Sequence, residues 1–337
     1  MNQTRYSRQM LFSPVGEKGQ EEISNSTVLI VGAGALGTVI SSHLVRAGVG
    51  KIRLIDRDYV ELSNLQRQML FDEADVKKAL PKAIAAKNKL EEINSNVIIE
   101  AIVSHVNHEN ISAFVQDVDV ILDGTDNFTT RYLLNDISFK HNIPYAYGGI
   151  VSSRGMTAFF LPNETPCLRC MVKTGAGNGQ TCDTVGVISP AVDMVASLQV
   201  TEALKYLTGN HVYLRRSLTT FDLWTNRRYD IQFSEPDPHC PTCSQQTYPA
   251  LMPKAHHQET VLCGRNTVQI HQKNEIDLVK WEKQLANIST VKRTPFLLKA
   301  QFPEDMSLVL FPDGRVLVQG TEDIVQARTW YDKYIGS

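Results

Sequence analysis

A glycine-rich segment between two apolar segments indicates a phosphate-binding turn near the start of the chain. Residues 28–31 (VLIV) precede GAGALG at 32–37, and the apolar spacing that follows is helical as far as Gly48. A second apolar segment, 51–56 (KIRLID), ends in the acid Asp56. Glycines let the backbone approach phosphates, and the carboxylate accepts bonds from ribose hydroxyls. We predict a nucleotide-binding βαβ unit; the alternative is a tight strand–helix turn without a ligand.

A polar run, NLQRQ at 64–68, follows the second apolar segment and suits neither a helix nor a strand. Two cations, Arg67 and Lys82, and one acid, Asp126, are expected near the same edge of the sheet. Cations beside a phosphate-favouring loop, together with an acid able to hold Mg²⁺, suit a triphosphate. They suit the neutral nicotinamide of a dehydrogenase less well, so NLQRQ is interpreted as a polar clamp for a triphosphate.

Strand-like and helix-like segments alternate through the first 150 residues. This order predicts a doubly wound, Rossmann-like and mostly parallel α/β sheet. Ligands of such sheets bind at the carboxyl ends of the strands, where Asp56 and Asp126–Asn127 are expected. The further helices are expected at 81–93, 108–118, 127–141 and 190–208, and the further strands at 97–103, 120–127 and 143–150.

Four of the six cysteines form two Cys-x-x-Cys pairs, Cys167 with Cys170 and Cys240 with Cys243. Each pair supplies two ligands for a tetrahedral Zn²⁺, and both pairs lie in proline-containing turns typical of zinc knuckles. Four thiolates leave no open coordination position, so the zinc is expected to be structural. The metal would join segments that lie far apart in the sequence.

Several motifs of the chain occur together in one known family. They are RYSRQ (5–9), GAGALG (32–37), DRDYVELSNLQRQ (56–68), Pro-Lys (81–82), DGTDN (123–127), TCDTVGVISP (181–190) and the two Cys-x-x-Cys pairs. On these motifs, the sequence from residue 5 to about 245 resembles the ubiquitin-activating-enzyme-like adenylyltransferases of the MoeB/ThiF/HesA family. That family activates the C-terminal glycine of a ubiquitin-like sulfur carrier as an acyl-adenylate, using ATP and releasing pyrophosphate, for molybdopterin or thiamine synthesis. The resemblance therefore implies a Gly-Gly-ended carrier as partner and a homodimer.

The resemblance assigns roles to individual residues. Asp56 would hold the ribose, Asn64 and Arg67 the triphosphate, and Lys82 the α-phosphate region. Asp126 would place Mg²⁺, and Arg8 would reach across a dimer to the phosphates of the partner. The nucleotide-binding set implied in this way is Gly32, Gly34, Ala35, Gly37, Asp56, Ser63, Asn64, Leu65, Gln66, Arg67, Lys82, Asp126 and Asn127.

The chain departs from the family pattern in two places. Relatives mostly have glycine where Ala35 stands, although alanine is small enough to leave nucleotide binding intact. The segment between NLQR and Lys82 is longer than expected, so Lys77 and Lys78 compete with Lys82 for its role. Within NLQRQ, Gln66 and Gln68 are interpreted either as ligands or as residues that fix the loop.

The implied reaction explains a site that is rich in cations and amides. A C-terminal carboxylate has a pKa of roughly 3.5 and is ionised at neutral pH, so it needs no general base to attack phosphorus. The obstacle is the approach of one anion to a polyanion. Arg67, Lys82, Arg8 and Mg²⁺ would offset that repulsion and stabilise the leaving pyrophosphate.

Cys182 lies in a glycine-rich stretch, and Ser189 and Pro190 after it are expected to be the cap and first turn of a helix. Some relatives use a cysteine at this place to bond the carrier, so Cys182 is a candidate nucleophile. The alternative is a spectator thiol on a flexible loop. Cys263 is expected to be a small buried residue.

The chain is expected to divide into an adenylyltransferase domain at 1–245, a linker at 246–258 and a small α+β domain at 259–337. Strands are expected at 295–302 and 306–311, a hairpin at Asp313-Gly314, and a last helix that ends at Gly336. Some relatives carry a sulfur-transferring rhodanese domain here, which needs a cysteine loop that this segment lacks. Carrier docking or contact between subunits is the preferred role.

Composition narrows the function classes. The chain has 337 residues, of which 42% are hydrophobic and 21% charged, with a formal net charge of −2. This charge argues against a general nucleic-acid binder, and no apolar run is long enough to span a membrane. A cytoplasmic enzyme is expected. The rival interpretations are an adenylating relative that acts on a tRNA base or a peptide terminus, a catalytically silent nucleotide-binding scaffold, and a nicotinamide dehydrogenase.

Overall fold

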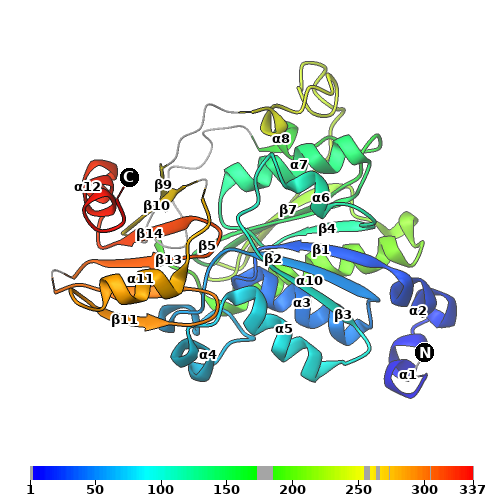
Figure 1. The fold of residues 1–337 in the computed structure, drawn as a ribbon. Helices are drawn as coiled ribbons and strands as arrows, with labels where there is room; N and C mark the ends of the chain where they lie inside the picture. Colours follow the sequence, from blue (N-terminus) through cyan, green and yellow to red (C-terminus); the bar gives the residue numbers. More distant parts are fainter. Residues whose placement is uncertain are drawn as a thin grey trace. The chain divides into compact units, whose positions relative to one another are not determined.

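The chain folds as two compact units (Figure 1). One unit comprises Met1–Lys77 and Pro81–Pro253, and the other comprises Lys78–Leu80 and Lys254–Ser337. No helix among the described residues is long and apolar enough to cross a membrane. The computed structural model describes residues 3–172, 185–253, 259–262, 266–272, 274–303 and 305–336.

The first unit is built on one eight-stranded sheet with the order β3-β2-β1-β4-β5-β6-β7-β8. The strands from β3 to β5 are parallel, whereas β6, β7 and β8 join them antiparallel. The predicted mostly parallel α/β sheet is confirmed, but its antiparallel extension was not predicted. The strands are β1 (Thr27–Val31), β2 (Lys51–Asp56), β3 (Ile98–Val103), β4 (Val120–Asp123), β5 (Tyr145–Val151), β6 (Arg154–Phe160), β7 (Ser217–Asp222) and β8 (Arg227–Gln232).

Helices cover both faces of this sheet, because its central strands are apolar on both sides (Figure 1). α6 and α7 lie on one face, and α3, α5 and α10 lie on the other. The helices are α1 (Gln3–Met10), α2 (Gly16–Asn25), α3 (Ala35–Ala47), α4 (Glu73–Lys78), α5 (Lys82–Ile93), α6 (Ile111–Phe114), α7 (Phe128–His141), α8 (Leu168–Met171) and α10 (Ser189–Leu207), with 3₁₀ turns η1 (Leu62–Asn64), η2 (His211–Tyr213) and η3 (Pro249–Leu251).

The ends of these helices follow familiar capping rules. α3 ends at Gly48 and α7 at Asn142, each in the left-handed conformation that a helix C-terminus favours. α10 has Pro190 in its first turn, as expected, but the expected cap at Ser189 is wrong by one residue. Ile188 occupies the cap position, and Ser189 is the first helical residue.

The second unit contains a six-stranded antiparallel sheet with the order β11-β12-β13-β14-β10-β9. The expected hairpin at Asp313-Gly314 is present, with Gly314 in the left-handed conformation (φ +90°). The expected α+β fold is confirmed, although β11 was not predicted. The elements are β9 (Glu259–Leu262), β10 (Thr267–His271), α11 (Leu278–Leu285), β11 (Thr290–Arg293), β12 (Leu298–Gln301), β13 (Ser307–Leu310), β14 (Arg315–Gln319) and α12 (Ile324–Tyr334).

The two helices of the second unit begin with aspartate caps and pack on one face of its sheet. Asp277 accepts bonds from the first backbone N–H groups of α11, and Asp323 does the same for α12. Tyr331 of α12 is buried in the core and its hydroxyl donates to Gln272 Oε1 at 2.8 Å. The described residues of this unit therefore form a hydrophobic core of their own.

The start of the expected linker is folded onto the first unit. Thr247 N donates to Pro241 O at 2.8 Å, and Ala250 N donates to Asp136 Oδ2 at 2.8 Å. Tyr248, Ala250 and Leu251 also pack on the apolar core of that unit. The first unit therefore includes the residues up to Pro253.

Candidate functional site

The GAGALG segment forms a tight turn between β1 and α3. Gly32 has φ +95°, and a Cβ added to it would lie 2.6 Å from Gly124 O. A Cβ on Gly37 would lie 1.8 Å from Gly32 O, so both positions exclude any side chain. Gly34 is different, because a Cβ there would meet only Gln68 Nε2, at 3.9 Å. The turn is closed on its inner side and open above Gly34, the cap residue of α3.

Asp56, the last residue of β2, fastens this turn from the side. Its Oδ2 accepts from Ala33 N at 2.6 Å, and its Oδ1 accepts from Asp58 N at 2.7 Å. Burial raises the pKa of the Asp56 carboxyl; the Lys82 ammonium opposes this rise and the Asp58 carboxylate adds to it. The acid that was predicted to hold a ribose is therefore also part of the frame of the turn.

Lys82 lies beside the end of β2, where the sequence interpretation placed a cation. Its side chain is only 3% exposed, and its Nζ lies 3.5 Å from Asp58 Oδ2. The backbone fixes it as well, because Lys82 N donates to Asp58 O at 2.8 Å. Its predicted competitors, Lys77 and Lys78, are exposed. Of these three lysines, Lys82 therefore provides the buried ammonium group at this edge of the sheet.

The NLQRQ run forms a compact turn around η1. Asn64 Oδ1 accepts from Glu61 N, and the Glu61 side chain accepts from the backbone of Asn64 in return. Arg67 Nη1 donates to Ser63 O at 2.9 Å. Asn64 is therefore engaged in the local fold, which its interpretation as a ligand did not anticipate. Gln66 is exposed and Leu65 half-buried, whereas Gln68 is buried.

Asp126 and Asn127 lie in the turn between β4 and α7. Asn127 Oδ1 accepts from Thr130 N at 2.9 Å and so caps α7. Asn127 Nδ2 lies 3.4 Å from Asp126 Oδ1, and the Asp126 side chain is exposed. An exposed carboxylate at the carboxyl edge of a sheet is suited to Mg²⁺, which usually keeps several waters when it binds protein.

A buried acid that the sequence interpretation missed supports this turn through hydrogen bonds to Thr125. Asp123 is fully buried at the end of β4. It accepts from Tyr145 OH at 2.6 Å and from Thr125 N and Oγ1 at 2.8 and 2.7 Å. Arg131 Nε lies 3.6 Å from its Oδ2. Burial raises the pKa of the Asp123 carboxyl, while Arg131 and these hydrogen bonds oppose the rise.

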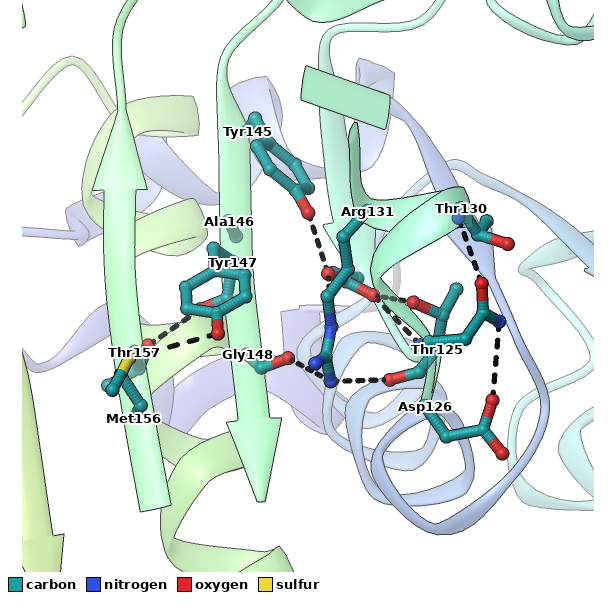
Figure 2. Close-up of polar contacts among 12 residues, drawn as sticks. Thr125, Asp126, Thr130, Arg131, Tyr145, Ala146, Tyr147, Gly148, Met156 and Thr157 are labelled. Atoms are coloured by element: carbon teal, nitrogen blue, oxygen red, sulfur yellow. Dashed lines mark hydrogen bonds and ion pairs between the residues drawn. The ribbon is translucent and has the colours of Figure 1, made fainter. Parts of the chain in front are cut away.

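Arg131, one turn into α7, connects that turn to the next strand (Figure 2). Its Nη2 donates to Thr125 O at 2.9 Å and to Gly148 O at 3.2 Å. The guanidinium also lies over the rings of Phe128 and Tyr147, 5.2 and 5.5 Å from their centroids. The turn carrying Asp126 is thereby held to β5. The only sequence signal was an arginine one turn into the helix after DGTDN.

Arg8 does not join these residues within one chain. It is an exposed residue of α1. Tyr6 of the same helix lies against Gly48, the residue that ends α3, and its hydroxyl accepts from Asn94 Nδ2 at 2.8 Å. The glycine turn lies at the opposite end of α3, a 13-residue helix about 20 Å long. Arg8 is therefore distant from the site of its own chain.

The four paired cysteines gather into one cluster. Their sulfur atoms all lie within 4.8 Å of one another, with Cys167 3.5 Å from Cys240 and Cys170 3.4 Å from Cys243. Tetrahedral zinc with Zn–S bonds of about 2.3 Å places its sulfurs about 3.8 Å apart. The donor set and the spacing therefore fit a structural zinc ion, as predicted.

One carboxylate of α7 is bonded to both cysteine loops. Asp136 is fully buried, and its oxygens accept from Arg169 Nε and Nη2 at 3.0 and 2.9 Å. Thr242 Oγ1 donates to the same carboxylate at 2.6 Å. The neighbouring Asn135 Oδ1 accepts from Leu168 N at 2.9 Å. Leu168 and Arg169 separate the first cysteine pair, and Thr242 lies within the second, so α7 positions both loops.

Two further cysteines lie outside the described residues. Cys182, the candidate nucleophile, and Cys263, expected to be buried, both fall in these parts of the chain. Their roles stay predictions, as do the individual ligand roles of the residues described above.

Comparison with known proteins identifies the family of this chain. A model of the ThiF family matches residues 6–242. The chain belongs to the ThiF family. The sulfur carrier protein ThiS adenylyltransferase of Bacillus subtilis is 46% identical over 336 residues, covering 98% of this chain and 99% of that protein. The molybdopterin-synthase adenylyltransferase of Escherichia coli is 34% identical over 242 residues, covering 72% and 96%. These relatives confirm the expected adenylyltransferase of the MoeB/ThiF type.

Solved structures support the fold. The crystal structure of Escherichia coli MccB with ATP matches with a TM-score of 0.63 at 24% identity, covering 72% of this chain and 75% of that one. At that identity the likeness concerns architecture alone. It agrees with the α/β sheet of the first unit.

Asp136→Asn replaces one acceptor oxygen with an amide NH₂ group, which cannot accept a hydrogen bond from Arg169 or from Ala250 N. We therefore expect zinc retention to weaken about 10- to 100-fold. Zinc release from the full chain to a coloured chelator measures this effect. Asp117→Asn, an exposed exchange of the same kind, serves as the control. Thr242→Val removes one bond and should give a smaller effect. Release at the wild-type rate from the Asp136 variant would contradict the role of this carboxylate.

Arg131→Met is expected to lower the free energy of unfolding by about 3–5 kcal/mol at pH 7.5, because Asp123 stays buried without its cation. The pKa of Asp123 is raised in the folded state, so folding favours its neutral form. The loss of unfolding free energy should therefore shrink as the pH falls through that pKa, because a neutral Asp123 needs no cation. Urea unfolding followed by circular dichroism at several pH values measures this dependence. Exposed Arg46→Met is the control, and a loss independent of pH would exclude the Asp123 charge as its cause.

Proposed function

We propose that the chain catalyses ATP-dependent adenylation of the C-terminal glycine of a ubiquitin-like sulfur carrier and releases pyrophosphate. The observation that carries this proposal is the 46% identity along almost the whole length of a protein named for ThiS adenylylation. It favours a ThiS-like carrier and thiamine synthesis. A molybdopterin carrier is the second candidate, supported by the relative of lower identity named for molybdopterin synthase.

The arrangement at the edge of the sheet supports ATP as the nucleotide. The open side of the turn at Gly34 admits phosphates near the N-terminus of α3. Asp56 lies beside the turn to accept bonds from the ribose, and the Lys82 ammonium lies at the end of the same strand. In this proposal Arg67 and Lys82 face the phosphates, and the exposed Asp126 carries Mg²⁺.

The reaction requires the neutralisation of negative charge more than the transfer of a proton. The ionised carboxylate of the carrier attacks the α-phosphorus and forms a C–O–P bond, while the bond to the β-phosphate oxygen breaks and pyrophosphate leaves. Mg²⁺, when bound, stabilises the charge of the leaving group. Arg67 and Lys82 keep positive charge near the reacting phosphorus. No thiol takes part, so Cys182 is not required for this step.

The distance between Arg8 and the site of its own chain supports a homodimer. In a symmetric dimer an exposed arginine at the far end of α3 is available to the site of the partner. Leu11 and Phe12, just after α1, are 72% and 63% exposed, and Val212 and Tyr213 are exposed as well. Asn210 Nδ2 donates to Pro14 O at 2.5 Å and joins these two segments. In this proposal these exposed apolar side chains would contact a second copy of the chain.

The rival substrates have less support. A tRNA base or a peptide terminus is not named by the relatives compared above, which are named for sulfur carriers and molybdopterin synthase. A silent scaffold is disfavoured because Lys82 and Asp126 both lie at the edge of the sheet where the reaction is proposed.

ATP–pyrophosphate exchange is expected only when a Gly-Gly-ended carrier is added, and most strongly with a ThiS-like carrier. Asp126→Ala should abolish exchange without changing the circular dichroism spectrum, because Mg²⁺ loses its ligand. Radiolabelled pyrophosphate incorporation measures the rate, and the exposed Asp117→Asn is the control. No exchange with either the thiamine or the molybdopterin carrier would refute the proposed function, and full activity of the Asp126 variant would refute its metal role.

Arg8→Ala and Asp126→Ala are each expected to be inactive alone but to recover activity when mixed. Subunit exchange creates dimers in which one site has an intact Asp126 and receives the intact Arg8 of the other subunit. Half of the sites in half of the dimers are then complete, so about a quarter of the wild-type rate should return. Tagged subunits confirm that exchange has occurred. No recovery in mixtures shown to contain mixed dimers would contradict the action of Arg8 across the dimer.

A further inference from the structure

Gln68 is a buried amide that faces the glycine turn and lacks a partner for its oxygen. Its side chain is only 3% exposed. Within the part of the chain that the structure describes, Gln68 Oε1 has no hydrogen-bond partner. Its Nε2 lies 3.9 Å from the position of a Cβ on Gly34, the open point of the turn. A buried acceptor without a donor is costly, so its retention needs an explanation.

Local folding does not supply that explanation. The backbone of Gln68 is already fixed, because its N–H donates to Asn64 O at 3.0 Å and its carbonyl accepts from Phe71 N at 3.1 Å. The reciprocal cap between Glu61 and Asn64 closes the same turn. A glutamine whose side chain fixed the loop would have its amide oxygen bonded there. The neighbouring Gln66 is exposed, so only one of the two glutamines faces the site.

We propose that Gln68 is a nucleotide-binding residue whose Oε1 accepts a hydrogen bond from an O–H group of the bound Mg²⁺–ATP complex. This inference rests on the proposed use of ATP. An amide oxygen only accepts, and phosphate and carboxylate groups ionised at neutral pH offer it no proton. The complex has two kinds of O–H donor within its polar part, the waters on Mg²⁺ and the ribose hydroxyls. Either would satisfy the buried oxygen.

The position of Gln68 in the sequence fits this role. It directly follows Arg67, so one turn carries a cation and a neutral amide at adjacent positions. The cation offsets charge, whereas the amide orients the complex without adding charge. Removing the amide is therefore expected to weaken binding of the nucleotide even when no carrier protein is present.

Gln68→Met tests the inference, because methionine has a similar volume and lacks a strong acceptor. Binding of Mg²⁺–ATP to the full chain without carrier, measured by isothermal titration calorimetry, should weaken about tenfold. The control Gln116→Met, at an exposed glutamine outside the nucleotide-binding set, should bind as the wild type does. Thermal unfolding checks that both variants are folded, and Gln68→Leu replaces Gln68→Met if the latter is not. Wild-type affinity in a folded Gln68 variant, or an equal loss in the Gln116 variant, would overturn the inference.

Three further titrations, with EDTA, 2′-deoxy-ATP and 3′-deoxy-ATP, identify the donor. If the donor is a water on Mg²⁺, the difference between wild type and Gln68→Met should vanish when ATP is titrated with EDTA. If the donor is a ribose hydroxyl, the difference should persist in EDTA and vanish with 2′-deoxy- or 3′-deoxy-ATP. A difference that persists in all three titrations would overturn the proposed O–H bond.

The experiments distinguish a failure of the proposed function from a failure of this inference. Wild-type binding of ATP without carrier-dependent exchange would refute sulfur-carrier adenylation and leave the Gln68 test valid. A wild-type chain that does not bind ATP would overturn both.

Discussion

The close contact of three glycines, Gly32, Gly37 and Gly124, is the constraint on which the rest of the site depends. A Cβ on Gly124 would lie 2.4 Å from Gly32 O, so the turn after β1 and the turn after β4 touch backbone to backbone. No side chain fits between them. The bonds that Asp56 accepts from Ala33 and Asp58 hold the other side. The polar side chains at this edge of the sheet are therefore displayed from a frame that has little room to shift.

Helix α7 links this frame to the cysteine cluster. It begins at Asn127, holds the turn to β5 through Arg131, and carries Asn135 and Asp136 at the cysteine loops. Four thiolates would leave a bound zinc no open position, so the metal would act by fixing structure. The buried charges along α7 are paired, as Asp123 is with Arg131 and Asp136 with Arg169, because an unpaired charge in the interior would be severely destabilising.

Sequence signals that lie within a few residues were the ones that could be predicted. The glycine turn, Asp56 and the two cysteine pairs depend on local spacing, and the structure brings each group together. Arg131 and Asp136 escaped prediction because their partners come from other strands and loops, and a buried polar residue in a helix resembles an exposed one in sequence. Strand β8 was also not predicted, although Tyr229 and Ile231 alternate with polar residues, and all six of its residues are exposed. Asn64 shows the converse, because the residue that was predicted to contact the triphosphate also closes its own turn.

The balance of charge at this edge of the sheet bears on the proposed dimer. ATP brings several negative charges to this edge, and the carrier tail adds another. Near the turn, the positive charge of Lys82 is already opposed by Asp58 and Asp56, and Asp126 adds a further negative charge. Arg67 is the cation of the NLQRQ run. In the proposed function, Mg²⁺ on Asp126 and an arginine from a second copy of the chain would add positive charge that helps to offset the polyanion. In the proposed dimer, Arg8, which lies beside the far end of α3 in its own chain, would supply that arginine.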